Sequence, residues 1–211
     1  DCLTRIGGLD PAPVAVPLPA PSPFGYRNKM EFSFGERLWH DEPPERLAPG
    51  TLPAAEFGLG LHARGRFDRI VNLEECHLVP PWAAEVVRAV RDAAKRTGFP
   101  PYATQSQGGF FRYLILRVGM NTGEKMINLV TYPVAPGSRE EGAALAVLDA
   151  AQRVVPAVTS LIHGVTASLA SVAFVETFRT VHGSPAIRER LLDDVFEIGP
   201  NTFFQTNTHQ A

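Results

Sequence analysis

Cysteine is scarce in this chain, which holds only Cys2 and Cys76 among 211 residues. Two thiols cannot form the disulfide framework of a small secreted domain. They are also too few for a four-thiolate zinc or iron–sulfur site. We therefore expect reduced, buried thiols and a cytoplasmic protein.

Long apolar runs and a strong net charge are missing as well. No run approaches the roughly 20 apolar residues that span a bilayer, and residues 1–8 lack the basic and apolar regions of a signal peptide. The formal net charge of −2 gives no overall attraction to nucleic acid, so RNA binding would need a local basic face. The sequence does not begin with methionine, which suggests a piece of a longer protein.

The motifs of a self-contained active site are absent too. No Gly-x-Gly-x-x-Gly dinucleotide or methyl-donor motif occurs, and no His-x-x-x-His or Cys-x-x-Cys pair could begin a metal site. Cys76 and His77 are adjacent, so on a strand they would point to opposite faces. Residue chemistry alone completes no catalytic site in this sequence.

Proline is abundant near the start of the chain, where six prolines fall between residues 11 and 25. Each proline fixes one φ angle and removes one backbone donor. We expect residues 1–25 to be an extended, proline-rich lead-in to the first strand.

Hydrophobic periodicity predicts the remaining elements. Alternating patterns indicate strands, and apolar faces at helical spacing indicate two helices that begin near prolines or end at glycine or proline. Expected strands cover residues 25–35, 56–63, 67–73, 110–118, 124–132, 158–166, 172–181, 187–191 and 195–198; expected helices cover 81–97 and 139–154. Runs of strands with two separate helices predict an α+β fold with a mostly antiparallel β-sheet.

Two short stretches are suited to RNA. Tyr26, Arg27 and Lys29 offer one ring for stacking and two cations for phosphate at the beginning of the first strand. Arg64 and Arg66 form a basic turn that could contact phosphate. Ordinary solvated charges on an edge strand and on a loop tip explain the same residues equally well.

The last twelve residues hold a second candidate site. Phe203, Gln205 and Asn207 follow a break at residues 199–200. Carboxamides both donate and accept hydrogen bonds, so they can read a nucleobase edge, and phenyl rings offer stacking faces. The plainer interpretation is a strand-to-helix turn with its rings in the core and its amides capping.

Four stretches follow one another in a familiar order: GYRNKMEF at 25–32, IVNLEEC at 70–76, RYLILR with TGEKMINLVT between 112 and 131, and FEIGPNTFFQTN at 196–207. In this order they resemble the S-adenosylmethionine-dependent RNA (uracil-5-)methyltransferase family, which makes 5-methyluridine in ribosomal and transfer RNA. The resemblance extends from about residue 5 to residue 211.

The resemblance implies different roles for two parts of the chain. Residues 26–199 would be a central α+β domain that positions RNA, and residues 200–211 would begin the junction to a Rossmann-like methyltransferase domain. Phe203, Gln205 and Asn207 match positions that line the pocket where methyl donor and flipped uracil meet. The nucleophilic cysteine and general base would lie in that further domain, so we expect no catalytic residue here and no activity of the chain alone.

The resemblance also implies cofactors and partners. The longer protein would use S-adenosylmethionine as its methyl donor. Its substrate would be RNA, and we expect ribosomal RNA before transfer RNA as the class. We expect no membrane partner. Cys76 matches the fourth ligand of a [4Fe–4S] cluster found in many bacterial members, whereas Cys2 matches none, so this chain is not expected to bind a cluster. A stand-alone RNA-binding module and a structural or protein-interaction domain remain as rival hypotheses.

Overall fold

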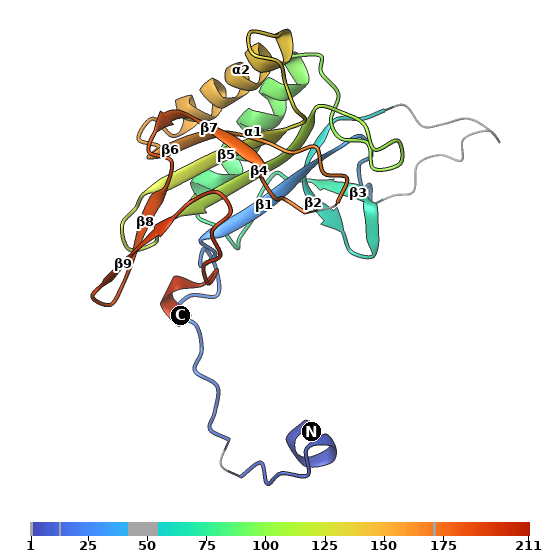
Figure 1. Cartoon of the computed structure of the whole chain (residues 1–211). Helices are drawn as coiled ribbons and strands as arrows, with labels where there is room; N and C mark the ends of the chain where they lie inside the picture. The colour runs from blue at the N-terminus through green and yellow to red at the C-terminus, as the bar shows by residue number, and fades with distance from the viewer. Residues whose placement is uncertain (1, 13, 42–54, 171) are drawn as a thin grey trace, which may run out of the picture.

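The computed structural model describes residues 2–12, 14–41, 55–170 and 172–211. Within these ranges, nine strands and two long helices make up the folded body, and single short turns of helix lie near both ends (Figure 1). In chain order they are η1 Cys2–Ile6, β1 Lys29–Gly35, β2 Gly58–Ala63, β3 Arg66–Asn72, α1 Pro81–Arg96, β4 Phe111–Val118, β5 Lys125–Thr131, α2 Arg139–Val154, β6 Ser160–Val165, β7 Thr177–Gly183, β8 Ile187–Leu191, β9 Asp194–Ile198 and η2 Thr208–Gln210.

Seven strands form one sheet in the order β3-β2-β1-β4-β5-β6-β7, and β8 and β9 form a separate hairpin. Every neighbouring pair is antiparallel except β5 and β6, which α2 connects as a parallel crossover. The predicted α+β class with a mostly antiparallel sheet is confirmed.

Helices α1 and α2 lie together on one face of the sheet (Figure 1). Pro81 opens α1 at its first turn, where a missing N–H costs nothing. The Ser138 hydroxyl caps α2 by accepting the Glu141 N–H at 3.2 Å. The apolar sides of both helices pack against Phe32, Leu114 and inward residues of neighbouring strands, which builds the main hydrophobic core.

A bulge at the start of β4 changes the expected alternation. Phe111 pairs with Thr131 whereas Tyr113 pairs with Val130, so one extra residue is inserted between them. Phe111 therefore packs into the helix-side core with Leu114, whereas Tyr113 belongs to a separate cluster with Ile115 and Val130.

The strand expected over residues 172–181 begins later in the structure, at Thr177. Glu176, just before it, accepts hydrogen bonds from the Thr166 hydroxyl and the Ala167 N–H. The Asn201 carboxamide accepts from the Val175 N–H at 3.1 Å and donates to the Val175 carbonyl at 2.7 Å, so these backbone groups are not paired with a strand.

The face opposite the helices is covered by the β8–β9 hairpin and the chain that follows it. Met126 and Ile162 from the sheet pack against Ile187 and Ile198 from the hairpin. Phe204 adds a half-buried ring to this second cluster. The last segment of the chain is therefore held against the sheet.

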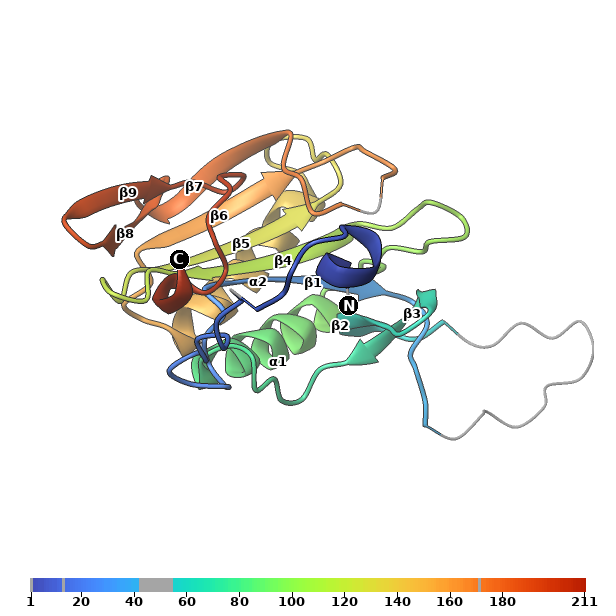
Figure 2. The ribbon, with the colours of Figure 1, turned by 90° about the horizontal axis from the view of Figure 1, so that it is seen from below.

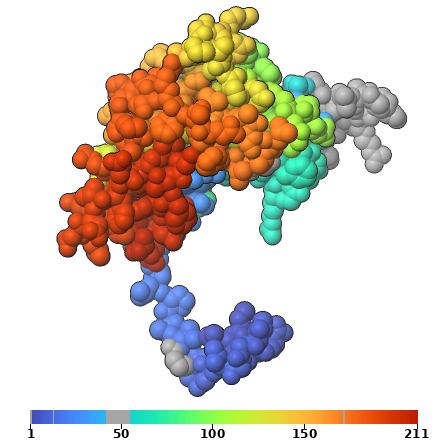
Figure 3. Space-filling view, in the orientation of Figure 1, coloured from blue at the N-terminus to red at the C-terminus, as the bar shows by residue number. Residues whose placement is uncertain are grey.

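The proline-rich segment is exposed over its described residues and runs away from the folded body (Figure 3). Pro13 lies outside the described residues. Residues 14–20 form neither helix nor strand, whereas Cys2–Ile6, within the range expected to be extended, form a short turn of helix. No helix in the described part of the chain is both long and apolar enough to cross a membrane.

Candidate functional site

The last segment of the chain lies beside the beginning of β1 (Figures 1 and 2). Arg27 forms an antiparallel bridge with Asn207. The Asn28 N–H donates to the Thr206 carbonyl at 2.9 Å, and its side-chain amide donates to the Gln205 carbonyl at 2.7 Å. Two regions that were predicted separately, one for RNA contact and one for a pocket, are therefore neighbours in space.

Arg117 on β4 holds the other end of this segment. Its Nη2 donates to the carbonyl oxygens of Pro200, at 3.1 Å, and Thr202, at 2.7 Å. Burial lowers the pKa of Arg117 to about 10, against an opposing effect of Glu31, so the guanidinium stays charged at neutral pH. The turn after β9 is therefore fixed by a charge-assisted pair of bonds.

Side chains between these attachments alternate in exposure. Phe203 is 81% exposed and Gln205 is exposed, whereas Phe204 is half-buried, with its ring 5.5 Å from that of Phe196. Asn207 makes no side-chain cap to the short helix that follows. The plainer interpretation, with both rings in the core and the amides as caps, holds only for Phe204.

Two hollows flank the contact between Arg27 and Asn207. One of about 270 Å³ is lined by Phe24, Tyr26, Met120, Asn207 and His209 together with Pro21, Ser22 and Gly25. The other, of about 380 Å³, is lined by Arg27, Lys29, Glu31 and Thr206 together with Met30, Leu61 and Leu78. One is mainly apolar with aromatic rings, and the other carries two cations and one carboxylate.

The two cations at the start of β1 differ in their hydrogen-bond and ion-pair partners. Lys29 forms an ion pair with Glu31 at 2.5 Å, at side-chain exposures of 27% and 40%. Arg27 is half-buried, and its Nε has no hydrogen-bond partner among the described residues. The charge of Lys29 is therefore already paired, and the Nε–H of Arg27 is enclosed by the protein and not open to an RNA phosphate.

Arg64 and Arg66 lie at the β2–β3 turn, and the two differ. The register of β1 with β2 places this turn at the end of the sheet where β1 begins. Arg64 is exposed, whereas Arg66 forms two 2.9 Å bonds with Asp68. Hydrogen bonding to Arg66 lowers the pKa of Asp68, so the pair is ionised and the charge of Arg66 is neutralised locally.

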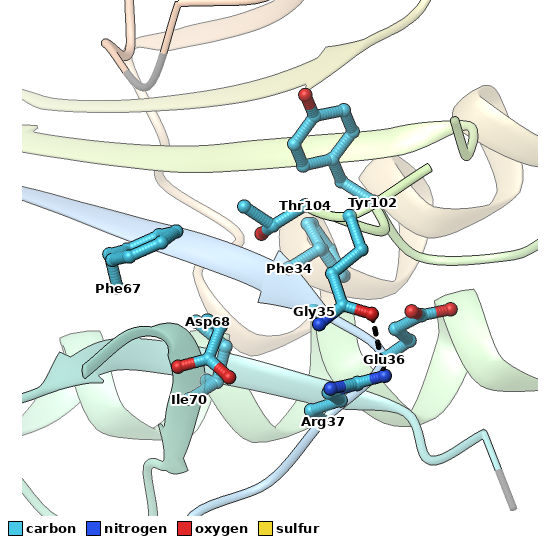
Figure 4. Close-up of a pocket in the computed structure, with 10 residues that line it drawn as sticks. Phe34, Gly35, Glu36, Arg37, Phe67, Asp68, Ile70, Tyr102 and Thr104 are labelled. Carbon is cyan, nitrogen blue, oxygen red and sulfur yellow. Dashed lines mark hydrogen bonds between the residues drawn. The ribbon is translucent and has the colours of Figure 1, made fainter. Parts of the chain in front are cut away.

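A third hollow lies where β1 ends, beneath Phe67 and Tyr102 (Figure 4). The Arg37 side chain is part of its lining and donates to the Gln105 carboxamide at 2.8 Å. Its interior space is about 10 Å³, enough for about one water molecule. This hollow is too small to hold a nucleotide.

Comparison with known proteins gives consistent matches over the whole chain. An RNA methyltransferase of Chlorobaculum tepidum is 33% identical over 100% of the chain. A tRNA (uracil(54)-C(5))-methyltransferase of Pyrococcus horikoshii is 28% identical over 92% of it. The crystal structure of the Pyrococcus abyssi tRNA (uracil-54, C5)-methyltransferase in complex with S-adenosyl-L-homocysteine superposes with a TM-score of 0.68, at 27% identity over 99% of the chain.

The chain belongs to the RNA (uracil-5-)methyltransferase family. No protein-family model matches it. It spans less than half of each of these three proteins: 43% of the Chlorobaculum protein, 40% of the Pyrococcus horikoshii enzyme and 42% of the crystallised chain.

Cys76 is the position of this chain that the family resemblance matched to a ligand of an iron–sulfur cluster. Its thiol is free and half-buried at the border of the main core. Within the described ranges, no group of three or more His, Cys, Asp or Glu side chains is placed to hold a metal ion. The described residues do not by themselves fit an iron–sulfur cluster.

Sequence reasoning missed three residues that hold the candidate site together. Asn28, Thr208 and Glu189 are all buried and hydrogen-bonded to one another in series. The signal for Glu189 was present, because it occupies an inward position between Ile187 and Leu191 on an alternating strand. A carboxylate at such a position indicates a buried polar network.

Proposed function

We propose that this chain is the RNA-positioning part of an S-adenosylmethionine-dependent RNA (uracil-5-)methyltransferase. Residues 26–199 form its RNA-contacting domain, and residues 200–211 begin the junction to a methyltransferase domain of a longer protein. One observation carries the proposal: hydrogen bonds from Asn28 hold the segment containing Gln205 against the strand that carries Arg27 and Lys29. The proposal assigns these cations and the Gln205 carboxamide to one RNA-binding surface.

The chemistry of the exposed segment suits a flipped uracil. Uracil presents carbonyl acceptors and one N–H donor, and a single carboxamide such as Gln205 can pair with both kinds of group. Extracting a base from its stack costs a few kcal/mol, which pairing and stacking in the pocket must offset. The exposed ring of Phe203 supplies a stacking face.

The surrounding cations suit the RNA backbone. Arg27 and Lys29 border the 380 Å³ hollow, and Arg64 is exposed at the same end of the sheet. Backbone contacts position RNA without reading its sequence. Tyr26 lines the neighbouring hollow, where a base adjoining the target could stack.

S-adenosylmethionine would supply the methyl group, and the S-adenosyl-L-homocysteine bound in the Pyrococcus abyssi complex supports this cofactor for the family. Phe203, Gln205 and Asn207 would form one wall of the shared donor and uracil pocket. The nucleophile and general base are expected outside this chain, so the chain alone would be inactive. The scarcity of cysteine supports a cytoplasmic location.

Methylation kinetics of the Gln205→Ala variant in the complete enzyme test the proposal. Loss of one paired carboxamide should lower kcat/KM for RNA uridine by roughly tenfold to a hundredfold, the equivalent of about 1–3 kcal/mol. Gln152→Ala, on the outside of α2, is the matched control and should leave the rate unchanged. Wild-type rates for Gln205→Ala would contradict a pocket role.

RNA binding by the 211-residue chain tests the positioning role separately. Removing the charge of Arg27 or Lys29 should reduce the slope of log affinity against log salt concentration by roughly 0.7–0.9 for each phosphate that the protein no longer neutralises. Arg66→Gln should change it less, since Asp68 already neutralises that charge. Binding without methylation by the complete protein would favour a stand-alone RNA-binding module, and no binding at low salt would favour a structural domain.

The RNA class is a separate question in the same experiment. The two Pyrococcus relatives are named as tRNA uracil-54 methyltransferases, whereas the sequence led us to expect ribosomal RNA. Comparing methylation of transfer and ribosomal RNA by the complete enzyme decides between them.

A further inference from the structure

Glu189 is a fully buried carboxylate that the RNA-contact surface does not use. It lies on β8 with 0% exposure, and no ion pair joins it to a lysine or arginine in the described part of the chain. Its oxygens instead accept bonds from the Met120 N–H at 2.6 Å, the Asn121 N–H at 3.0 Å and the Arg190 N–H at 2.9 Å. Because burying a charge is costly, these donors must hold it in one place.

Thr208 supplies a fourth donor to this carboxylate. Its hydroxyl lies 3.0 Å from Glu189 Oε2 and 2.8 Å from the side-chain nitrogen of Asn28. A hydroxyl has one proton, and an amide NH₂ can only donate. The bonds therefore run in one direction: Asn28 donates to Thr208, and Thr208 donates to Glu189.

The second amide proton of Asn28 reaches the candidate site itself. It is donated to the Gln205 carbonyl at 2.7 Å. The series of bonds thus links the β4–β5 turn and β8 to the main chain at Gln205, while the Gln205 side chain stays exposed. A side chain that contacts a base from an irregular segment, as proposed for Gln205, needs such support to be held in the productive geometry.

We propose that Asn28, Thr208 and Glu189 form a positioning relay that sets the main chain at Gln205 for the target uracil. The inference rests on the proposed function, because it gives Gln205 the role of contacting the base. None of the three residues is a catalytic residue, since each acts through the orientation of Gln205. The relay predicts that the Thr208 hydroxyl, and not its methyl group, determines activity.

Thr208→Val and Thr208→Ser form a matched pair for the test, because valine keeps the shape and serine keeps the hydroxyl. In the complete enzyme, Thr208→Val should lower kcat tenfold or more while KM for RNA changes less than about threefold, since ordering of the pocket is lost and backbone contacts remain. Thr208→Ser should restore most of kcat. In the 211-residue chain, Thr208→Val should speed hydrogen exchange at the Asn28 amide, which pairs with Thr206, and Thr208→Ser should not.

The outcomes separate the two proposals. A wild-type enzyme that does not methylate RNA uridine would defeat the proposed function, and the exchange measurement would still decide whether the relay orders the segment. An active wild type with undiminished kcat in Thr208→Val would overturn the relay alone, as would a Thr208→Ser variant as slow as Thr208→Val. If Thr208→Val does not fold, Asn28→Asp, which cannot donate to Thr208 or Gln205, should show the same loss of kcat, and full activity there would overturn the relay.

Discussion

The two faces of the seven-stranded sheet are built from different kinds of residue. On the helix-covered face, Phe32, Leu114 and Leu129 are fully buried among apolar side chains. On the opposite face, Arg117 and Asn128 are also buried, with exposures of 3% and 0%. Both have side-chain atoms with no hydrogen-bond partner among the described residues. The first face excludes polar groups, whereas the second accommodates them.

The difference reflects what covers each face. Helices satisfy their own backbone hydrogen bonds, so an apolar surface suffices beneath them. Irregular segments have free carbonyls, and polar side chains meet them: Arg117 donates to Pro200 and Thr202, and Arg112 donates to Ser168 at 2.8 Å. One face therefore stabilises the fold, and the other holds the segments on which the candidate site is built.

Phe32→Ala should produce the largest loss of stability, because the helix-covered face is the main core. Removing a fully buried ring costs about 3–5 kcal/mol, measured as a decrease in the free energy of unfolding in urea. Phe67→Ala is the control, since that ring is 73% exposed and should cost far less. Equal losses for the two variants would contradict the division of the sheet into a helix-covered face that stabilises the fold and an opposite face that holds the candidate site.

Most of the helix-covered face could be predicted from sequence. Alternation in β4 and β5 and the apolar side of α1 locate these elements within a few residues, because burial on one side imposes the period of the element. The bulge at Phe111 could not be predicted, since an inserted residue leaves the local pattern almost unchanged. The parallel pairing of β5 with β6 depends on where α2 returns the chain, which no local pattern encodes.

The candidate site was predictable by residue type but not by arrangement. Arg27 and Gln205 were noted for their chemistry, yet they are 178 positions apart and nothing local brings them together. Asn28 makes that connection, and its role depends on partners far along the chain. Long-range side-chain bonds leave little signal in a single sequence because each partner looks like an ordinary surface polar residue.

His163 is the polar exception on the helix side and should make stability depend on pH. Its Nε2 lies 2.9 Å from the Thr131 hydroxyl, which itself donates to the Tyr132 carbonyl, so the His163 Nε2–H is the donor in this bond. Burial lowers the pKa of His163 from 6.5 to about 4; nearby Arg179 lowers it further, and Glu141 acts against both.

Between pH 6.5 and about 4 the unfolded chain binds a proton at His163 that the folded chain does not. Stability should therefore fall as pH decreases through this range, by up to about 3 kcal/mol below pH 4. Unfolding free energies at several pH values, compared between wild type and His163→Gln, measure the effect. The glutamine variant keeps a donor and cannot titrate, so its stability should fall less; parallel curves would show that His163 is not protected from protonation.

Arg117→Met should have a smaller effect on stability, and that effect should be confined to the opposite face. The methionine fills most of the volume but leaves the Pro200 and Thr202 carbonyls without their donor, at a cost of roughly 1–3 kcal/mol. Hydrogen exchange should accelerate in residues 199–206 and stay unchanged in α1, because the helix-covered core does not contact this segment. Arg117→Lys keeps the charge, but its side chain is one atom shorter than the path to Nη2 and reaches the two carbonyls less well, so it should fall between wild type and methionine. Faster exchange throughout α1 would show instead that the two faces unfold together and that the site segment is part of the core.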